Sequence, residues 1–109
     1  MNRKKIYIAS PYTIGDVAVN VKRSMDAANE LIKLGYAPYC PLLCHFLHMN
    51  NPQDYEVWMD VGLTWLVHCD AVLRLEGESK GADIECSAAI DHNIPVFDSI
   101  DQFRPKAPK

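Results

Sequence analysis

The sequence lacks the features that mark several large classes of protein. No apolar run approaches the roughly 20 residues that a membrane-spanning helix needs. Basic residues are not in excess, because 11 lysines and arginines stand against 14 aspartates and glutamates, a formal net charge of −3. Internal repeats and low-complexity segments are also missing. We therefore expect neither a membrane partner nor binding to duplex nucleic acid, which favours basic proteins.

The sequence also lacks an export signal and the cysteine spacing of a disulfide framework. The basic residues 1–5 are followed by an apolar stretch that ends at Pro11, too early for the apolar core of a secretory signal. The four cysteines are widely spread: Cys40, Cys44, Cys69 and Cys86. We therefore expect reduced thiols and a cytoplasmic location.

The composition is that of a single globular domain. Of the 109 residues, 49% are hydrophobic and 23% are charged, values that argue against disorder. A chain of this length can bury a core of its own and leaves no room for two domains. We expect one domain over residues 1–104 and a disordered tail over residues 105–109.

Strand-like and helix-like segments alternate along the chain. Short apolar runs predict strands over residues 6–9, 36–40, 71–75 and 94–97. Helical spacing and end signals predict three helices: from a cap at Asp16 to a stop at Gly35, from a cap at Asp54 to about residue 66, and from the turn 77–81 to about residue 92. Residues 42–53 show no clear period and predict a loop, and residues 99–103 predict a last helical turn.

This alternation is typical of an α/β fold with a doubly wound, parallel sheet of four or five strands and helices on both faces. In such sheets, ligands bind at the carboxyl ends of the strands. The site should therefore lie where residues 10–15 leave the first strand and residues 76–81 leave the third. Ser10 and Tyr12, in the first of these loops, are candidate ligand-binding residues.

The strongest local feature runs from Gly77 to Glu85, where a strand ends, a small loop turns and a helix begins. The free amides at the helix start, together with the helix dipole, form an anion site, to which Ser79 adds a hydroxyl and Gly81 a close backbone approach. Glu85 lies about one turn into the helix, close enough to face whatever the loop holds. A plain helix cap at Ser79 explains the same spacing.

Tyr7 is a second candidate. It lies in the middle of the first strand, at the centre of the predicted sheet, where a buried phenol needs a hydrogen-bond partner such as a carboxylate. An ordinary core aromatic side chain also explains this position.

A third group is a C-x3-C-H-x2-H cluster formed by Cys40, Cys44, His45 and His48. Its spacing matches structural zinc sites poorly, because the histidines of such sites usually follow a dozen or so residues later. The sequence therefore favours a loop that lines the pocket, with His45 or His48 donating to a ligand.

The helix after Asp54 is apolar over more than one face, with Trp58 and Trp65 on one stripe. Core packing explains this pattern, and so does an interface between two copies of the chain; we expect a homo-oligomer, a dimer or larger. Asp60 lies within the same helix. Exposure to solvent is its simplest role, and contact with a ligand is the alternative.

Three segments together resemble the nucleoside 2-deoxyribosyltransferase superfamily, most of all its small phage and bacterial branch. Residues 5–12 (KIYIASPY) resemble its first strand and turn. Residues 63–72 resemble the helix that leads into its third strand, especially in the deoxynucleoside 5′-monophosphate N-glycosidases. Residues 79–85 resemble its S-x-G-x-x-x-E motif, and the same order of segments spans nearly the whole chain.

The resemblance implies an enzyme that cleaves the N-glycosidic bond of a nucleoside or its 5′-monophosphate, by hydrolysis or by transfer to a second base. Glu85 is then the nucleophile that attacks C1′ and forms a covalent glycosyl-enzyme, and Tyr7 orients it. Ser79, with the amides of Gly81 and Ala82, then holds a 5′-phosphate. Such chemistry needs neither a metal nor an organic cofactor.

The chain departs from the family's pattern at one place. The family often carries an aspartate in its second helix that contacts the base, and this place falls on Gly62. Asp60 is two residues away, about 200° around a helix. His45 and His48 are then candidates for the missing donor. The alternative functions are a protein that captures a nucleotide without turnover and a purely structural oligomer.

Overall fold

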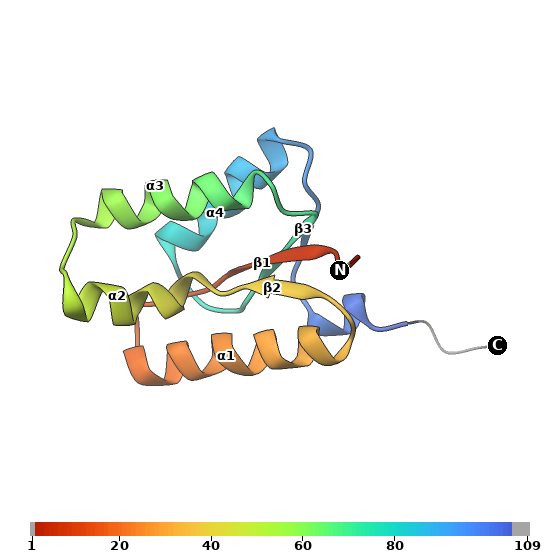
Figure 1. The fold of residues 1–109 in the computed structure, drawn as a ribbon, viewed down its shortest axis with the longest axis horizontal. Helices are drawn as coiled ribbons and strands as arrows, with labels where there is room; N and C mark the ends of the chain where they lie inside the picture. The colour runs from red at the N-terminus through yellow and green to blue at the C-terminus, as the bar shows by residue number, and fades with distance from the viewer. Residues whose placement is uncertain (1, 106–109) are drawn as a thin grey trace.

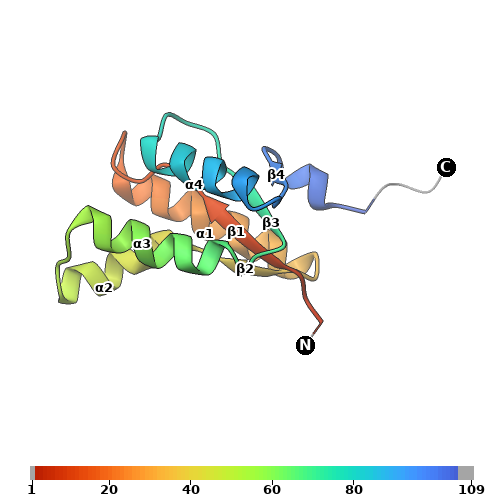
Figure 2. The same ribbon diagram turned by 90° about the horizontal axis from the view of Figure 1, so that it is seen from above.

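The computed structural model describes residues 2–105, which form one four-stranded parallel sheet in the order β2-β1-β3-β4 (Figures 1 and 2). The strands are β1 (Lys5–Ala9), β2 (Ala37–Tyr39), β3 (Ala71–Arg74) and β4 (Val96–Phe97). The helices are α1 (Val17–Lys33), α2 (Cys44–Asn50), α3 (Tyr55–Leu66) and α4 (Lys80–Asp91), with short 3-10 turns η1 (Pro41–Leu43) and η2 (Ile100–Phe103). The predicted fold class is confirmed. Of the expected tail, residues 106–109 lie outside the described residues.

The two faces of the sheet carry separate cores, and β1 contributes to both. In Figure 1, α1 lies on one side of the sheet and α3 and α4 lie on the other. Ile6 and Ile8 face α1, where they pack in one cluster with Leu31. Tyr7 points to the opposite face, covered by α3 and α4, where it packs in a second cluster with Leu66. The two-residue period of a strand therefore sends the Tyr7 phenol toward α3 and α4.

The ends of α1 follow the sequence signals. The side chain of Asp16 accepts a hydrogen bond from the Val19 amide at 3.2 Å, which satisfies one of the free donors at the helix start. After the last turn, Gly35 adopts a φ of 95° and donates its amide hydrogen to the Ile32 carbonyl at 3.0 Å. Glycine takes this left-handed conformation without steric cost, so the chain turns back into β2.

The predicted loop over residues 42–53 is wrong in part, because it contains η1 and α2. Helix α2 has seven residues and no side-chain cap. Three of its large apolar side chains are exposed: Phe46, Leu47 and Met49. A helix this short, with no buried apolar stripe, leaves no periodic signal in the sequence.

Helix α3 begins after Asp54 as expected, but the Asp54 side chain makes no capping hydrogen bond. The apolar side chains of the helix have different surroundings. Leu66 is fully buried, Trp58 is half-buried and Trp65 is 56% exposed. The Trp65 ring stacks on Tyr39 of β2, with 5.7 Å between the ring centroids. Association of two copies through α3 stays a prediction. No helix within residues 2–105 combines the length and apolar character needed to cross a membrane.

The loops that follow β1 and β3 meet at the carboxyl edge of the sheet. Gly77 has a φ of 125° and lies so close to Pro11 that an added Cβ would stand 2.9 Å from Pro11 Cγ. On the other side of the first loop, the buried Asn20 of α1 donates from Nδ2 to the carbonyls of Tyr12 and Ile14, at 3.0 and 2.8 Å. The first loop is therefore held in shape by α1 and by the second loop.

Replacement of Asn20 by Ala removes both of these donors and leaves the two carbonyls without their partner. We expect the free energy of unfolding to fall by roughly 2 kcal/mol, the usual cost of a lost buried hydrogen-bonding group. Chemical denaturation measures the change. Asn29→Ala, at an exposed position of the same helix, is the matched control, and equal losses in the two variants would contradict this role of Asn20.

Candidate active site

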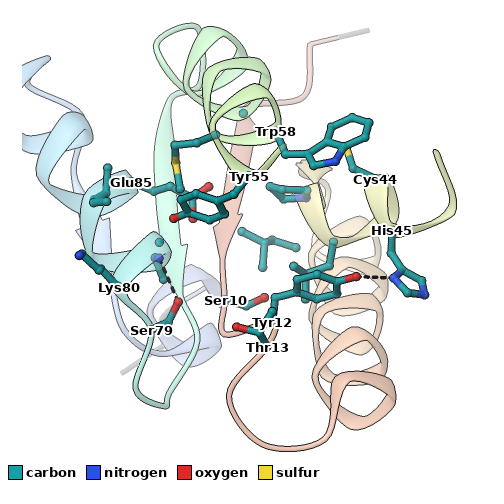
Figure 3. A pocket seen from close by; sticks show the side chains of 18 of the residues that line it. Ser10, Tyr12, Thr13, Cys44, His45, Tyr55, Trp58, Ser79, Lys80 and Glu85 are labelled. Carbon is teal, nitrogen blue, oxygen red and sulfur yellow. Dashed lines mark hydrogen bonds between the residues drawn. The ribbon is translucent and has the colours of Figure 1, made fainter. Parts of the chain in front are cut away.

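A cavity of about 680 Å³ lies at the carboxyl edge of the sheet, a size typical of small-molecule sites (Figure 3). Its walls come from β1 and the loop after it, from α2 and α3, and from the start of α4. The following residues singled out from the sequence line it: Tyr7, Ser10, Tyr12, His45, His48, Ser79, Gly81, Ala82 and Glu85. Asp60 is exposed and is not among the lining residues, so the structure does not bring it to the pocket.

Glu85 and Tyr7 meet in the buried part of this cavity. The Tyr7 hydroxyl donates a hydrogen bond to Oε2 of Glu85, and both side chains are more than nine-tenths buried. Tyr7 arrives from the centre of β1, while Glu85 arrives from the second turn of α4. The bond occupies one carboxylate oxygen, whereas Oε1 of this cavity-lining side chain bonds to no residue between 2 and 105.

Burial controls the charge state of this pair. Loss of solvent raises the pKa of Glu85 to about 7, although the Tyr7 hydrogen bond and the positive charge of Arg74 act in the opposite direction. Burial, and next the charge of Glu85, raise the pKa of Tyr7 well above its ordinary range. Tyr7 therefore remains a hydrogen-bond donor at neutral pH, while the ionisation of Glu85 is shifted toward neutral pH.

Gly62 provides the space that the pair occupies. This glycine is buried in α3, and an added Cβ would stand 2.6 Å from the Tyr7 hydroxyl and 3.7 Å from Oε2 of Glu85. The first distance is shorter than any ordinary contact. The family resemblance expects an aspartate at this position. Here the position of the Tyr7 phenol leaves room only for a glycine.

Arg74 is a site residue that the sequence analysis missed. Its guanidinium donates to the carbonyls of Leu75 and Gly77 and forms an ion pair with Asp83 of α4 at 3.0 Å. It therefore fixes the loop between β3 and α4 and adds positive charge near Glu85. The signal available in the sequence is a charged residue at the end of an otherwise apolar buried strand.

The start of α4 forms the wall beside this loop. Oγ of Ser79 accepts a hydrogen bond from the Ala82 amide at 3.1 Å, so Ser79 is the helix cap that the plainer interpretation predicted. The Ala82 amide is therefore already engaged. The amides of Lys80 and Gly81, in the first turn, have no partner within the helix, and both residues line the cavity.

Ser10 stands out on the facing loop (Figure 3). It is 7% exposed and lines the cavity, and its Oγ has no hydrogen-bond partner among the described residues. A buried hydroxyl without a partner costs free energy, and a polar group of a ligand in the cavity would remove that cost. This atom is the clearest sign that the cavity takes a polar ligand.

Two aromatic and imidazole pairs form the wall opposite α4. The Tyr12 hydroxyl is hydrogen-bonded to Nδ1 of His45 (Figure 3). The Trp58 indole donates from Nε1 to Nδ1 of His48 at 2.9 Å. The tryptophan was expected in the core or at an interface between copies, and its contact with the pocket was not foreseen.

The cysteines and histidines of the C-x3-C-H-x2-H cluster have separate partners. Cys40 is buried with its Sγ 2.8 Å from Oγ of Ser24, and His48 is bonded to Trp58. Within residues 2–105, no three histidine, cysteine or acidic side chains are placed to hold a metal ion. The zinc interpretation therefore has no geometric support in the described part of the chain.

The comparisons with known proteins match this chain to one family. The model of a family described as a domain of unknown function (DUF7768) matches residues 4–99, a range that includes Tyr7 and Glu85. The chain belongs to this family. No curated protein matches it.

Among solved structures, this DUF7768 chain is similar to a 2-deoxyribosyltransferase from the psychrotolerant bacterium Bacillus psychrosaccharolyticus. The TM-score is 0.63 at 22% sequence identity, and the match covers 84% of this chain and 69% of that one. That enzyme is described as a biocatalyst for the synthesis of antiviral and antitumoral nucleosides. At this identity, the likeness establishes a shared fold.

The raised pKa of Glu85 predicts a pH-dependent stability. Its ordinary value is 4.5, so the folded protein holds the proton more tightly than the unfolded chain, and stability falls as the pH rises from about 4.5 to about 7. Glu85→Gln removes this ionisation. We expect the variant to be more stable than the wild type above pH 7, by on the order of 3 kcal/mol at about 1.4 kcal/mol per pKa unit.

Denaturation curves of the wild type and Glu85→Gln at several pH values from 4 to 8 measure this difference. Glu76→Gln, at an exposed carboxylate, is the control and should follow the wild type. A constant difference between wild type and Glu85→Gln over this range would contradict the assignment.

The close contact at Gly62 predicts an unusual sign for a glycine substitution. Gly→Ala inside a helix ordinarily stabilises a protein by roughly 0.5–1 kcal/mol. At Gly62 we expect Ala to destabilise it, because the new methyl group meets the Tyr7 hydroxyl. Tyr7→Phe removes that oxygen, so the double variant should recover stability relative to Gly62→Ala. A double-mutant cycle of unfolding free energies tests this coupling, and additive effects would exclude it.

Proposed function

We propose that the protein cleaves the N-glycosidic bond of a nucleoside 5′-monophosphate or nucleoside, by hydrolysis or by transfer to a second base. The observation that carries the proposal is the buried carboxylate of Glu85, held by Tyr7 at one oxygen and open to a ligand-sized cavity at the other. A positioned carboxylate of this kind serves as a nucleophile in retaining glycoside chemistry. The shared fold with a 2-deoxyribosyltransferase supports a place in that superfamily.

In the proposed reaction, Oε1 of ionised Glu85 attacks C1′ of the sugar. The C1′–N bond breaks, its electron pair leaves with the base, and the base then takes up a proton from water. The glycosyl ester on Glu85 is resolved when water, or a nitrogen of a second base, attacks C1′ and releases the carboxylate. The proton lost by this water or base neutralises the hydroxide that formed when the departing base was protonated. Tyr7 keeps its proton throughout and holds Oε2, so that the second oxygen is presented to the sugar.

A phosphate on the substrate fits the polar end of the cavity. The unengaged amides of Lys80 and Gly81 and the unpartnered Oγ of Ser10 belong to residues that line it. Glu85 lies about one helical turn further into α4, which is a suitable separation between a 5′-phosphate and C1′. We therefore favour a 5′-monophosphate over a free nucleoside.

Capture of a nucleotide without turnover is the second candidate. The observation that favours it is Gly62, which has no side chain. At this position the family resemblance expects an aspartate that contacts the base. On this reading the same cavity binds the nucleotide, and Glu85 does not react with it.

Incubation with deoxy- and ribonucleosides and their 5′-monophosphates, with free base measured by chromatography, tests the proposal. We expect the wild type to release base and Glu85→Gln and Glu85→Ala to release none, while both variants stay folded. Because the nucleophile must be ionised, kcat/KM should rise with pH to about 7 and then level off.

Asp60→Asn, at an exposed carboxylate on α3 outside the cavity, is the control and should keep full activity. A second base added to the reaction separates hydrolysis from transfer. No release from any compound, combined with nucleotide-induced thermal stabilisation of the protein, would contradict turnover and favour capture.

A further inference from the structure

Two donors fix the tautomer of His48. The Trp58 indole donates to its Nδ1 at 2.9 Å, and the Gln53 backbone amide donates to the same atom at 3.2 Å. Indole and amide N–H groups only donate, so Nδ1 carries no proton. The proton of the neutral imidazole therefore lies on Nε2, which bonds to no residue between 2 and 105 and belongs to a side chain that lines the cavity.

Helix α3 sets the spacing between His48 and the reacting centre. Gly62 lies against the Tyr7–Glu85 pair, and Trp58 lies against His48. These two positions are four residues apart on the same face of the helix, a rise of about 6 Å. A base attached to a sugar carbon at Glu85 would reach the imidazole by extending along α3.

We propose that His48 binds the nucleobase, donating a hydrogen bond from Nε2 to an acceptor atom of its edge and stabilising the negative charge that develops there as the base leaves. This inference rests on the proposed function for the identity of the ligand. His48 transfers no proton. A neutral imidazole is an electrostatic donor, as in other enzymes where a histidine polarises a carbonyl without being protonated.

The proposal accounts for the pairing of Trp58 with His48. Both donors bond to Nδ1, so the pairing keeps the N–H of the ring at Nε2. Trp58 is then a positioning residue, which acts on the ligand through His48. His45 has a different partner, the Tyr12 hydroxyl, and its tautomer is not fixed in this way.

Two substitutions at position 48 separate donation from structure. His48→Asn keeps an acceptor close to the place of Nδ1, so it can hold Trp58 but presents no donor at the place of Nε2. His48→Gln reaches the place of Nε2 with an amide N–H but leaves Trp58 without its acceptor. We expect Asn to lower kcat/KM about 10- to 100-fold, the usual effect of one hydrogen bond to a developing charge, and Gln to keep most of the activity.

The size of the activity defect on substrates with different leaving groups separates the two roles, because a purely structural role of His48 would affect all of them equally. 2′-Deoxyguanosine 5′-monophosphate is compared with its N7-methyl derivative, whose base leaves as a neutral molecule and gains little from a donor. For a pyrimidine-specific enzyme, the pair is 2′-deoxyuridine 5′-monophosphate and its 5-fluoro derivative, which has the better leaving group. The defect of His48→Asn should be smaller for the activated member of each pair. Equal defects for the two members of a pair would overturn the proposal. So would a result in which His48→Asn keeps the activity and His48→Gln loses it.

A binding measurement tests His48 even if the protein has no turnover. In the Glu85→Gln background, calorimetry gives the affinities for the same nucleotides and for 2-deoxyribose 5-phosphate, which has no base. His48→Asn should weaken binding of the nucleotides and leave that of the sugar phosphate unchanged. Absence of base release by the wild type would contradict the proposed function alone, whereas equal effects on nucleotide and sugar phosphate would contradict the role of His48. His68→Asn, at an exposed histidine outside the cavity, is the control.

Discussion

The hydrogen bond from Tyr7 to Glu85 is the constraint around which the rest of the site is arranged. It joins the central strand of the sheet to the second turn of α4, and both partners are buried. A carboxylate at this depth would be costly without a donor. The phenol supplies that donor, and Gly62 supplies the room for it, since a side chain on α3 at this point would occupy the position of the hydroxyl. Three elements far apart in the sequence therefore depend on one contact.

The same contact shows how the fold carries the cost of a buried carboxylate. Burial raises the pKa of Glu85 to about 7, and the phenol and Arg74 only partly offset this rise. A protein selected for stability alone would gain from a neutral side chain at this position. Arg74 also bonds the loop that leads into α4, so the residue that helps to ionise Glu85 also fixes the loop beside it. Charge and position of the carboxylate are thus controlled together.

Local signals were sufficient for the fold and for part of the site. The strands and the caps at Asp16 and Ser79 depend on neighbouring residues, and they lie where the sequence predicted them. The contacts of Arg74 and His48 could not be predicted, because each joins segments whose proximity exists only after folding. Asp60 shows why closeness in sequence is not sufficient. It lies two residues before position 62, where the family resemblance expects an aspartate. Two residues along a helix place its side chain on another face, in solvent.

The glycine at position 62 keeps side chains out of this part of the cavity wall. A carboxylate at this position needs a Cβ, and that atom would stand 2.6 Å from the Tyr7 hydroxyl. The phenol and a side chain at position 62 are therefore incompatible in this arrangement, and Glu85 depends on the phenol. The wall across the cavity, formed by α2, has no such conflict. Its seven-residue helix has no cap of its own and is tied to α3 through the bond between His48 and Trp58. The bond that holds α2 in place thus also fixes which nitrogen of His48 carries the proton.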